Sequence, residues 1–206
     1  MLGTRRDEGQ PRRNPFAPHE IAQRTAASVK PLINPLPARK NIGFNLLIDA
    51  ASNKDGQIDR GLEEIAAADP QFDVAGFMEG ARHAFGAVVR AYNDGDRNSL
   101  RALLSPKLYA DFDAGIKARE DSGHVATTDI HRIKAAHIVE AHLGGTMAYI
   151  TVDYDVEQTT VTRDKAGAAI EATPHITNVE DIWTFTRDIR SDDPNWTLIE
   201  TRAAEK

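Results

Sequence analysis

The chain of 206 residues contains no cysteine; 41% of its residues are hydrophobic and 27% are charged. The missing cysteine excludes structural disulfides, thiolate zinc sites, iron–sulfur ligation and cysteine nucleophiles. No stretch of 18 apolar residues occurs, so the sequence predicts no membrane-spanning helix. The net charge of −6 is uneven: residues 1–40 carry eight basic and three acidic side chains, a balance of +5, whereas residues 41–206 balance at −11.

The first 56 residues are predicted to form a basic, proline-rich arm. Six of the ten prolines lie within residues 1–40, and proline at this density fixes φ and removes backbone donors, which disfavours helix and sheet alike. Phe44 and residues 46–48 form a short apolar group that is either disordered or a docking motif. A basic arm on an acidic body favours contact between the arm and an anionic surface, and the acidic body argues against nucleic acid as a partner. The arm residues expected beside a membrane are Arg5, Arg6, Arg12 and Arg13.

Helical spacing of apolar residues predicts that the folded domain, residues 57–206, begins with four helices. The clearest of them starts after Asp73, a typical N-cap residue, and ends at Gly95, where glycine permits a left-handed C-cap. The predicted helices run from Gln57 to Pro70, from Asp73 to Asn93, from Asp96 to Leu104 and from Ser105 to Gly123.

From Thr127 onward the apolar period changes to two, which predicts strands. Apolar residues alternate with polar ones between Ala148 and Glu157, which gives one buried and one solvated face. Gly144-Gly145 is predicted as the tight turn before this strand. The predicted strands lie around 130–143, 148–157, 179–187 and 196–201. Helices followed by an antiparallel meander of about four strands predict an α+β fold, with the helices packed on one face of a curved sheet.

Sequence motifs give little support for catalysis or metal binding. An EF-hand aligned on Gly56 would place its first and twelfth ligand positions at Ala51 and Leu62, which cannot bind calcium. The seven histidines have no metal-ligand spacing, so we expect neither a metal nor a cofactor. Asp181 is the best candidate for a general base, because it shares an inward strand face with Trp183, where burial would raise its pKa. A structural aspartate held by hydrogen bonds is the alternative.

Aromatic residues supply a candidate ligand pocket, although aromatics at this spacing are more often core residues. Helices that cross a curved sheet often leave a concavity at one end, which favours a pocket there. The candidate pocket residues are Phe77, Phe85, Phe112, Trp183, Phe185 and Trp196.

Three segments together carry a family resemblance. Residues 61–73, GLEEIAAADPQFD, lead into a helix that begins with 77–81, FMEGA; later come 181–188, DIWTFTRD, and 193–198, DPNWTL. These segments resemble the Tim44-like domain of alphaproteobacterial inner-membrane proteins, which is related to the mitochondrial import subunit that tethers the Hsp70 motor. The likeness covers about residues 57–204.

The resemblance implies a cone-shaped α+β domain like nuclear transport factor two, with an apolar pocket and with membrane association. It implies a non-enzymatic adaptor or scaffold with a protein or lipid partner, in protein translocation or in the handling of membrane proteins. Bacterial relatives begin with a transmembrane helix and an Arg-rich stretch, so the arm is expected at the cytoplasmic face of the inner membrane, either peripheral or behind an anchor that this chain lacks. A small-molecule isomerase or dehydratase of the same fold, with Asp181 as base, is the alternative.

Overall fold

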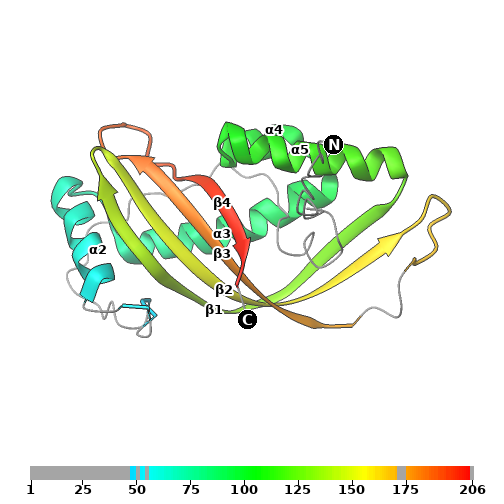
Figure 1. The fold of residues 1–206 in the computed structure, drawn as a ribbon, viewed down its shortest axis with the longest axis horizontal. Helices are drawn as coiled ribbons and strands as arrows, with labels where there is room; N and C mark the ends of the chain where they lie inside the picture. Colours follow the sequence, from blue (N-terminus) through cyan, green and yellow to red (C-terminus); the bar gives the residue numbers. More distant parts are fainter. Residues whose placement is uncertain (1–46, 50–51, 54–55, 171–174, 205–206) are drawn as a thin grey trace, which may run out of the picture.

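The computed structural model describes residues 47–49, 52–53, 56–170 and 175–204 (Figure 1). Within these residues four helices precede four strands, which confirms the predicted α+β class and element order. The elements are α2 (Gln57–Ala68), α3 (Val74–Asp94), α4 (Arg97–Leu103), α5 (Pro106–Ser122), β1 (Val125–Gly144), β2 (Met147–Arg163), β3 (Thr177–Asp188) and β4 (Thr197–Ala203).

The four strands form one antiparallel meander in the order β1-β2-β3-β4. The register between β1 and β2 shifts at three places, between Ile130 and Arg132, between Ile133 and Ala135 and between Ile138 and Glu140. Bulges of this kind bend a strand and increase its twist. The strands accordingly curve; α3 crosses one face of the sheet, α4 and α5 lie above it in Figure 1, and α2 lies against one end of β1.

Side-chain caps fix the helix boundaries where the sequence predicts them. The Asp73 carboxylate accepts a hydrogen bond of 2.7 Å from the Gly76 amide at the start of α3. Asp96 caps α4 and Ser105 caps α5 in the same manner. Gly95 ends α3 with a φ of 67°, a left-handed conformation that favours glycine. α3, α4 and α5 therefore each begin where a side chain of the local sequence accepts hydrogen bonds from free backbone amides, whereas α2 has no side-chain cap.

The core lies between α3 and the inner face of the sheet. The apolar row of β2 is fully buried, as the alternation predicts. α3 covers this row with a long apolar face that includes Phe77, Met78, Phe85 and Val88. Burial of each large side chain stabilises the fold by roughly 1.5–3 kcal/mol.

The free edge of β1 is covered by two features distant in sequence. Residues 47–49 form a parallel bridge to Ile138, whose amide donates to the Leu47 carbonyl at 2.7 Å, and Ile48 is buried. The Asn93 side chain of α3 bonds both the amide and the carbonyl of Thr128, at 3.0 and 2.8 Å. Covered edges resist pairing with other chains. The described part of the apolar group thus contacts β1, while Phe44 and Leu46 lie outside the described residues.

Two strand boundaries differ from the prediction. β1 begins at Val125, five residues before the predicted start, because Ala126 and Thr128 face the core although few apolar residues mark this stretch. The β1–β2 turn consists of Gly145 and Thr146 instead of Gly144-Gly145, because Gly144 still pairs with Met147.

Candidate functional site

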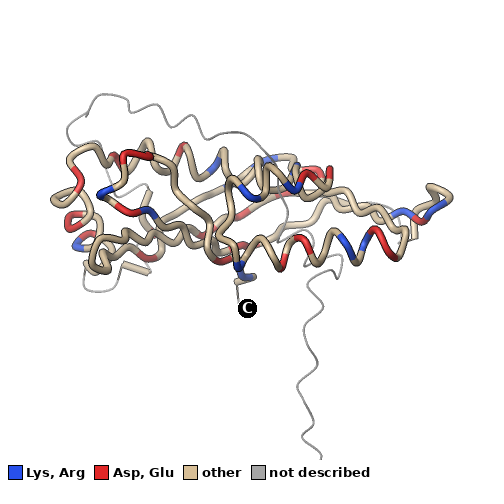
Figure 2. The backbone as a smooth tube through the Cα atoms, turned by 90° about the horizontal axis from the view of Figure 1, so that it is seen from above, with Lys and Arg blue, Asp and Glu red and all other residues tan. Residues whose placement is uncertain are grey.

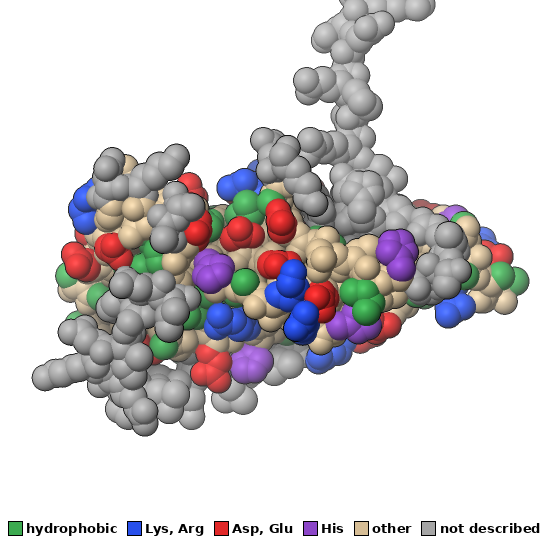
Figure 3. Space-filling view, turned by 90° about the horizontal axis from the view of Figure 1, so that it is seen from below, with side chains coloured by type: hydrophobic (Ala, Val, Ile, Leu, Met, Phe, Trp, Pro, Cys, Tyr) green, Lys and Arg blue, Asp and Glu red, His purple; other side chains and the backbone are tan. Residues whose placement is uncertain are grey.

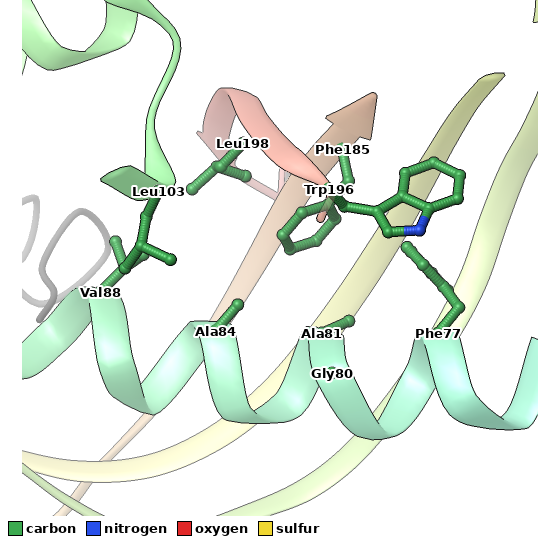
Figure 4. A pocket seen from close by; sticks show the side chains of 9 residues that line it. All are labelled: Phe77, Gly80, Ala81, Ala84, Val88, Leu103, Phe185, Trp196 and Leu198. Atoms are coloured by element: carbon green, nitrogen blue, oxygen red, sulfur yellow. The ribbon is translucent and has the colours of Figure 1, made fainter. Parts of the chain in front are cut away.

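A small pocket lies between α3, α4 and the last two strands (Figure 4). Its cavity volume is about 20 Å³, close to the space that one water molecule needs. Nine residues line it, and none of them has a titratable side chain: Phe77, Gly80, Ala81, Ala84, Val88, Leu103, Phe185, Trp196 and Leu198.

The floor of the pocket is a stretch of small residues on α3. Gly80, Ala81 and Ala84 lie between the larger side chains of Phe77 and Val88, and together they leave room above the helix (Figure 4). A longer side chain at any of the three small positions would fill part of this space. The pocket therefore exists because of local sequence on one helix as well as because of the curvature of the sheet.

Aromatic rings form one wall of the pocket. The rings of Phe77 and Trp196 meet edge to face with centroids 4.7 Å apart, and Phe185 meets Phe77 at 5.8 Å. Phe72, outside the lining, lies 6.0 Å from Trp196. Edge-to-face pairs at these distances add roughly 0.5–1.5 kcal/mol each beyond the area that they bury.

A buried arginine lies beside the aromatic wall. The Arg187 guanidinium forms an ion pair with the Asp69 carboxylate, and both side chains are about nine-tenths buried. The guanidinium carbon also lies 5.7 Å from the centre of the Trp196 ring, within the range of a cation–π interaction. Burial lowers the pKa of Arg187, and the nearby Asp193 carboxylate partly opposes that shift. The guanidinium nevertheless stays charged, because arginine does not deprotonate in proteins.

Two segments of similar sequence meet at this arginine. Residues 69–72 read Asp-Pro-Gln-Phe and residues 193–196 read Asp-Pro-Asn-Trp. In each segment the aspartate carboxylate accepts a hydrogen bond of 3.0 Å from the backbone amide two residues later, which forms an Asx turn. Each turn delivers its aromatic residue to the same side of the pocket. Both segments belong to the stretches that carry the family resemblance.

The comparison with protein families decides the assignment. The profile of the Tim44-like domain matches residues 58–203. The chain belongs to the Tim44-like domain family. This match confirms the resemblance drawn from the three sequence segments.

Other comparisons add little to the Tim44-like assignment. No curated protein matches the chain. Among solved structures, the crystal structure of the intermembrane space region of chloroplast protein ARC6 is similar, with 10% sequence identity and a TM-score of 0.39. The likeness covers 53% of this chain and 78% of the ARC6 chain. It is too weak to support an argument about function.

The Tim44-like domain brings together three of the six aromatic residues singled out in the sequence. Phe77, Phe185 and Trp196 line the pocket. Phe85 and Trp183 are buried in the core, with tilted rings whose centroids are 4.6 Å apart. Phe112 is buried on α5, where its ring meets that of Tyr92 at 5.6 Å. The binding of a ligand in this pocket stays a prediction.

Sequence reasoning missed the small residues of the pocket floor. Gly80 and Ala84 are one helical turn apart, and Ala81 completes the same face of α3. This spacing of small residues beside Phe77 is the signal that marks the pocket in the sequence. Leu103 and Leu198 could not be assigned in this way, because their contact with α3 depends on the tertiary fold.

Asp181 is fully buried on the inner face of β3 and lies opposite Tyr154 of β2. It is not among the residues that line the pocket. The Tyr154 hydroxyl donates a hydrogen bond of 3.0 Å to the Ala81 carbonyl oxygen. Burial raises the pKa of Tyr154 well above its ordinary value; the charge of Arg82 lowers it and that of Asp181 adds to the rise. The tyrosine is therefore neutral at physiological pH.

The charges of the described surface are of mixed sign. Both acidic and basic residues occur along α5, where Asp113 and Glu120 both pair with Arg97 of α4 at 2.6 and 2.9 Å (Figure 2). The outer face of the sheet also mixes both signs (Figure 3), with ion pairs such as Lys134–Asp155 at 2.8 Å. Such pairs have little influence on stability individually.

Neither a metal cluster nor a membrane-spanning helix is found in the described part of the chain. There, no three His, Asp or Glu side chains converge as metal ligands would. Across the same residues, no helix has both the length and the apolarity to span a bilayer. The four arm residues expected beside a membrane, Arg5, Arg6, Arg12 and Arg13, lie outside the described residues.

Proposed function

We propose that this Tim44-like protein is a non-enzymatic adaptor at a membrane, whose pocket holds an apolar group of a protein or lipid partner. The observation that carries the proposal is the lining of the pocket, which is apolar throughout. Removal of apolar surface from water contributes about 25 cal/mol per Å², and aromatic walls supply rigid contact area. A side chain or acyl chain that enters between Ala84 and Trp196 gains this energy without requiring a charged neighbour.

The basic arm supplies the second contact. Near an anionic leaflet each lysine or arginine contributes up to about 1 kcal/mol, and salt weakens this attraction. The charge balance of +5 over residues 1–40 supports this role, and the −11 of the remaining chain makes nucleic acid an unfavourable partner. Family membership supports a site at the cytoplasmic face of a bacterial inner membrane, in the handling or translocation of proteins.

An isomerase or dehydratase of this fold is less well supported. Proton transfer requires a titratable group within reach of the bound molecule. Asp181 would be that group, and it does not line the pocket. An adaptor requires no such group, so the pocket favours the adaptor.

Vesicle flotation tests the proposal. The full chain is mixed with vesicles of pure phosphatidylcholine or of phosphatidylcholine with phosphatidylglycerol, at low and high salt. We expect binding to the anionic vesicles at low salt, and we expect its loss when Arg5, Arg6, Arg12 and Arg13 are replaced by glutamine. Binding by this variant equal to that of the parent chain would overturn the role of the arm.

The pocket is tested separately with Ala84→Phe, which fills the floor beside Trp196. The matched control is Ala110→Phe at an exposed position of α5. Salt-resistant flotation that Ala84→Phe abolishes and Ala110→Phe retains would assign the apolar contact to a lipid. If neither variant changes flotation, the partner of the pocket is sought among proteins by crosslinking from position 84, and equal crosslinking from position 110 would count against the pocket.

A further inference from the structure

We propose that Arg187, Asp69 and Trp196 form a latch that holds the mouth of the apolar pocket closed. Trp196 is the movable wall, Arg187 holds it in place, and Asp69 holds Arg187. The inference rests on the proposed function only in taking this pocket as the ligand site.

Trp196 is suited to move because of its position in the chain. It directly precedes β4, at the end of the β3–β4 loop, and its side chain is only partly buried. Within the pocket its ring contacts Phe77 at 4.7 Å. Its ring also contacts two residues that do not line the pocket, Phe72 at 6.0 Å and the Arg187 guanidinium at 5.7 Å. A shift of the β3–β4 loop therefore moves a wall of the pocket while the helical floor stays in place.

Arg187 cannot follow such a shift easily. It lies within β3, and its ion pair with Asp69 is almost completely buried. Asp69 is the C-cap residue of α2, where its amide donates to the Ile65 carbonyl at 2.8 Å. A buried charge is strongly disfavoured without its partner. The guanidinium is therefore fixed at both the sheet and the end of α2, and it presents a stationary cation to the Trp196 ring.

A second arginine in the same region, Arg190, is exposed and only weakly paired, unlike Arg187. Arg190 pairs only loosely with Asp188, at 3.5 Å, and its side chain is 71% exposed. It is three residues from Arg187 in sequence and carries the same charge. Arg190 thus supplies a matched control for the effect of removing an arginine from this region.

The latch has a direct consequence for binding. When only a fraction of molecules has an open mouth, the apparent dissociation constant equals the intrinsic constant divided by that fraction. A variant without the latch raises the open fraction and binds an apolar molecule more tightly, although no contact with that molecule has been added. A partner that draws Arg187 or Asp69 away from the other would have the same effect.

The test uses the full chain in solution, without membranes. The protein has two tryptophans, of which Trp183 is fully buried, so acrylamide quenching of fluorescence reports mainly on Trp196. The double variant Asp69→Asn with Arg187→Met removes both charges, so neither is left buried without its partner. Binding of the apolar dye N-phenyl-1-naphthylamine is measured in parallel. We expect about twofold stronger quenching and about three- to tenfold tighter dye binding in the double variant, and no change in Arg190→Met.

Unchanged quenching and unchanged dye affinity in the folded double variant would overturn the latch, and so would weaker dye binding. If the double variant does not fold, Arg187→Lys replaces it, because lysine keeps the charge and loses the planar group above the indole. Quenching equal to that of the parent chain would then overturn the proposal. Ala84→Phe serves as a control for the dye site: if it fails to block the dye, the pocket assignment of the proposed function is wrong, while quenching of Trp196 still decides on the latch.

Discussion

Tyr154 and Ala81 are joined by a hydrogen bond of 3.0 Å between the tyrosine hydroxyl and the helix carbonyl oxygen. Ala81 belongs to the floor of the pocket, and Tyr154 belongs to the fully buried row of β2. The bond therefore fixes the distance between the pocket floor and the sheet. Trp183 and Phe85 pack around the same tyrosine ring, so the pocket rests on a rigid aromatic layer.

Replacement of Tyr154 by phenylalanine removes this bond and keeps the ring. We expect a loss of about 1 kcal/mol in the free energy of unfolding, since the helix carbonyl keeps its bond within α3. Urea denaturation at pH 7 measures the change. A loss close to zero would mean that the hydroxyl does not fix the floor.

The raised pKa of Tyr154 predicts that the fold loses stability at alkaline pH. Burial raises the pKa of Tyr154 above its value in the unfolded chain, so above about pH 10 the unfolded state releases a proton that the folded state keeps. The stability provided by the neutral tyrosine is fully present below pH 10 and declines above it, by at most about 1.4 kcal/mol per pH unit. We expect Tyr154→Phe to show a shallower decline between pH 10 and 11. Parallel profiles for the two proteins would contradict the assigned shift.

Gly61 is predicted to be essential for the docking of α2. A Cβ atom at this position would collide with the Ala141 carbonyl of β1, whereas one at Gly86 of α3 would meet no atom within 4 Å. Gly61→Ala should therefore destabilise the fold by about 1–3 kcal/mol through overpacking. Gly86→Ala should stabilise it by about 0.5–1 kcal/mol through helix propensity. Thermal melts of the two variants check the opposite signs, and equal shifts would show that α2 does not approach β1 this closely.

Asn93 should protect the edge of β1. Asn93→Ala leaves the amide and carbonyl of Thr128 without their bonds, so we expect a loss of about 1–2 kcal/mol and a concentration-dependent increase in size. Light scattering and urea denaturation measure the two effects. Asn98→Ala, at an exposed position of α4, should change neither. A strictly monomeric Asn93→Ala protein of unchanged stability would refute the protective role.

Asp153 lies on the outer face of β2, where the fold destabilises the charged form of its carboxyl group. Burial raises its pKa, and the Glu180 and Asp49 carboxylates add to the rise, while His137 opposes it. The folded state thus favours the protonated form, so stability from this group is present below the ordinary carboxyl pKa and is lost as the pH rises through the elevated value. Asp153→Asn should therefore stabilise the protein at pH 7, by less than about 1 kcal/mol because solvent screens the site. A lower free energy of unfolding for Asp153→Asn at pH 7 would contradict the raised pKa of Asp153.

Much of the fold follows from local sequence. Helix caps at Asp73, Asp96 and Ser105 and the alternation along β2 depend on neighbouring residues, which is why these predictions are confirmed. The first residues of β1 were missed because Thr128 is buried through its bonds to Asn93, 35 residues away.

The candidate site was predictable in part for the same reason. Aromatic residues can be identified directly from the sequence, and three of the six proposed as pocket residues line the pocket. The pocket itself depends on the small size of Gly80 and Ala84, and their spacing on one face of α3 is a weaker signal in the sequence than the aromatic residues are. The pairing of Arg187 with Asp69 could not be predicted from neighbouring residues, because the two residues are 118 apart in sequence number.

The bridge between residues 47–49 and Ile138 has a mechanical consequence. A pull on the N-terminal arm reaches the folded domain first at this bridge, where the chain runs parallel to β1. Two hydrogen bonds, of 2.7 and 3.1 Å, and the buried Ile48 then bear the load together in shear, instead of one after another as in unzipping. Tension along the arm is thus delivered to the curved sheet at β1 before it reaches α2.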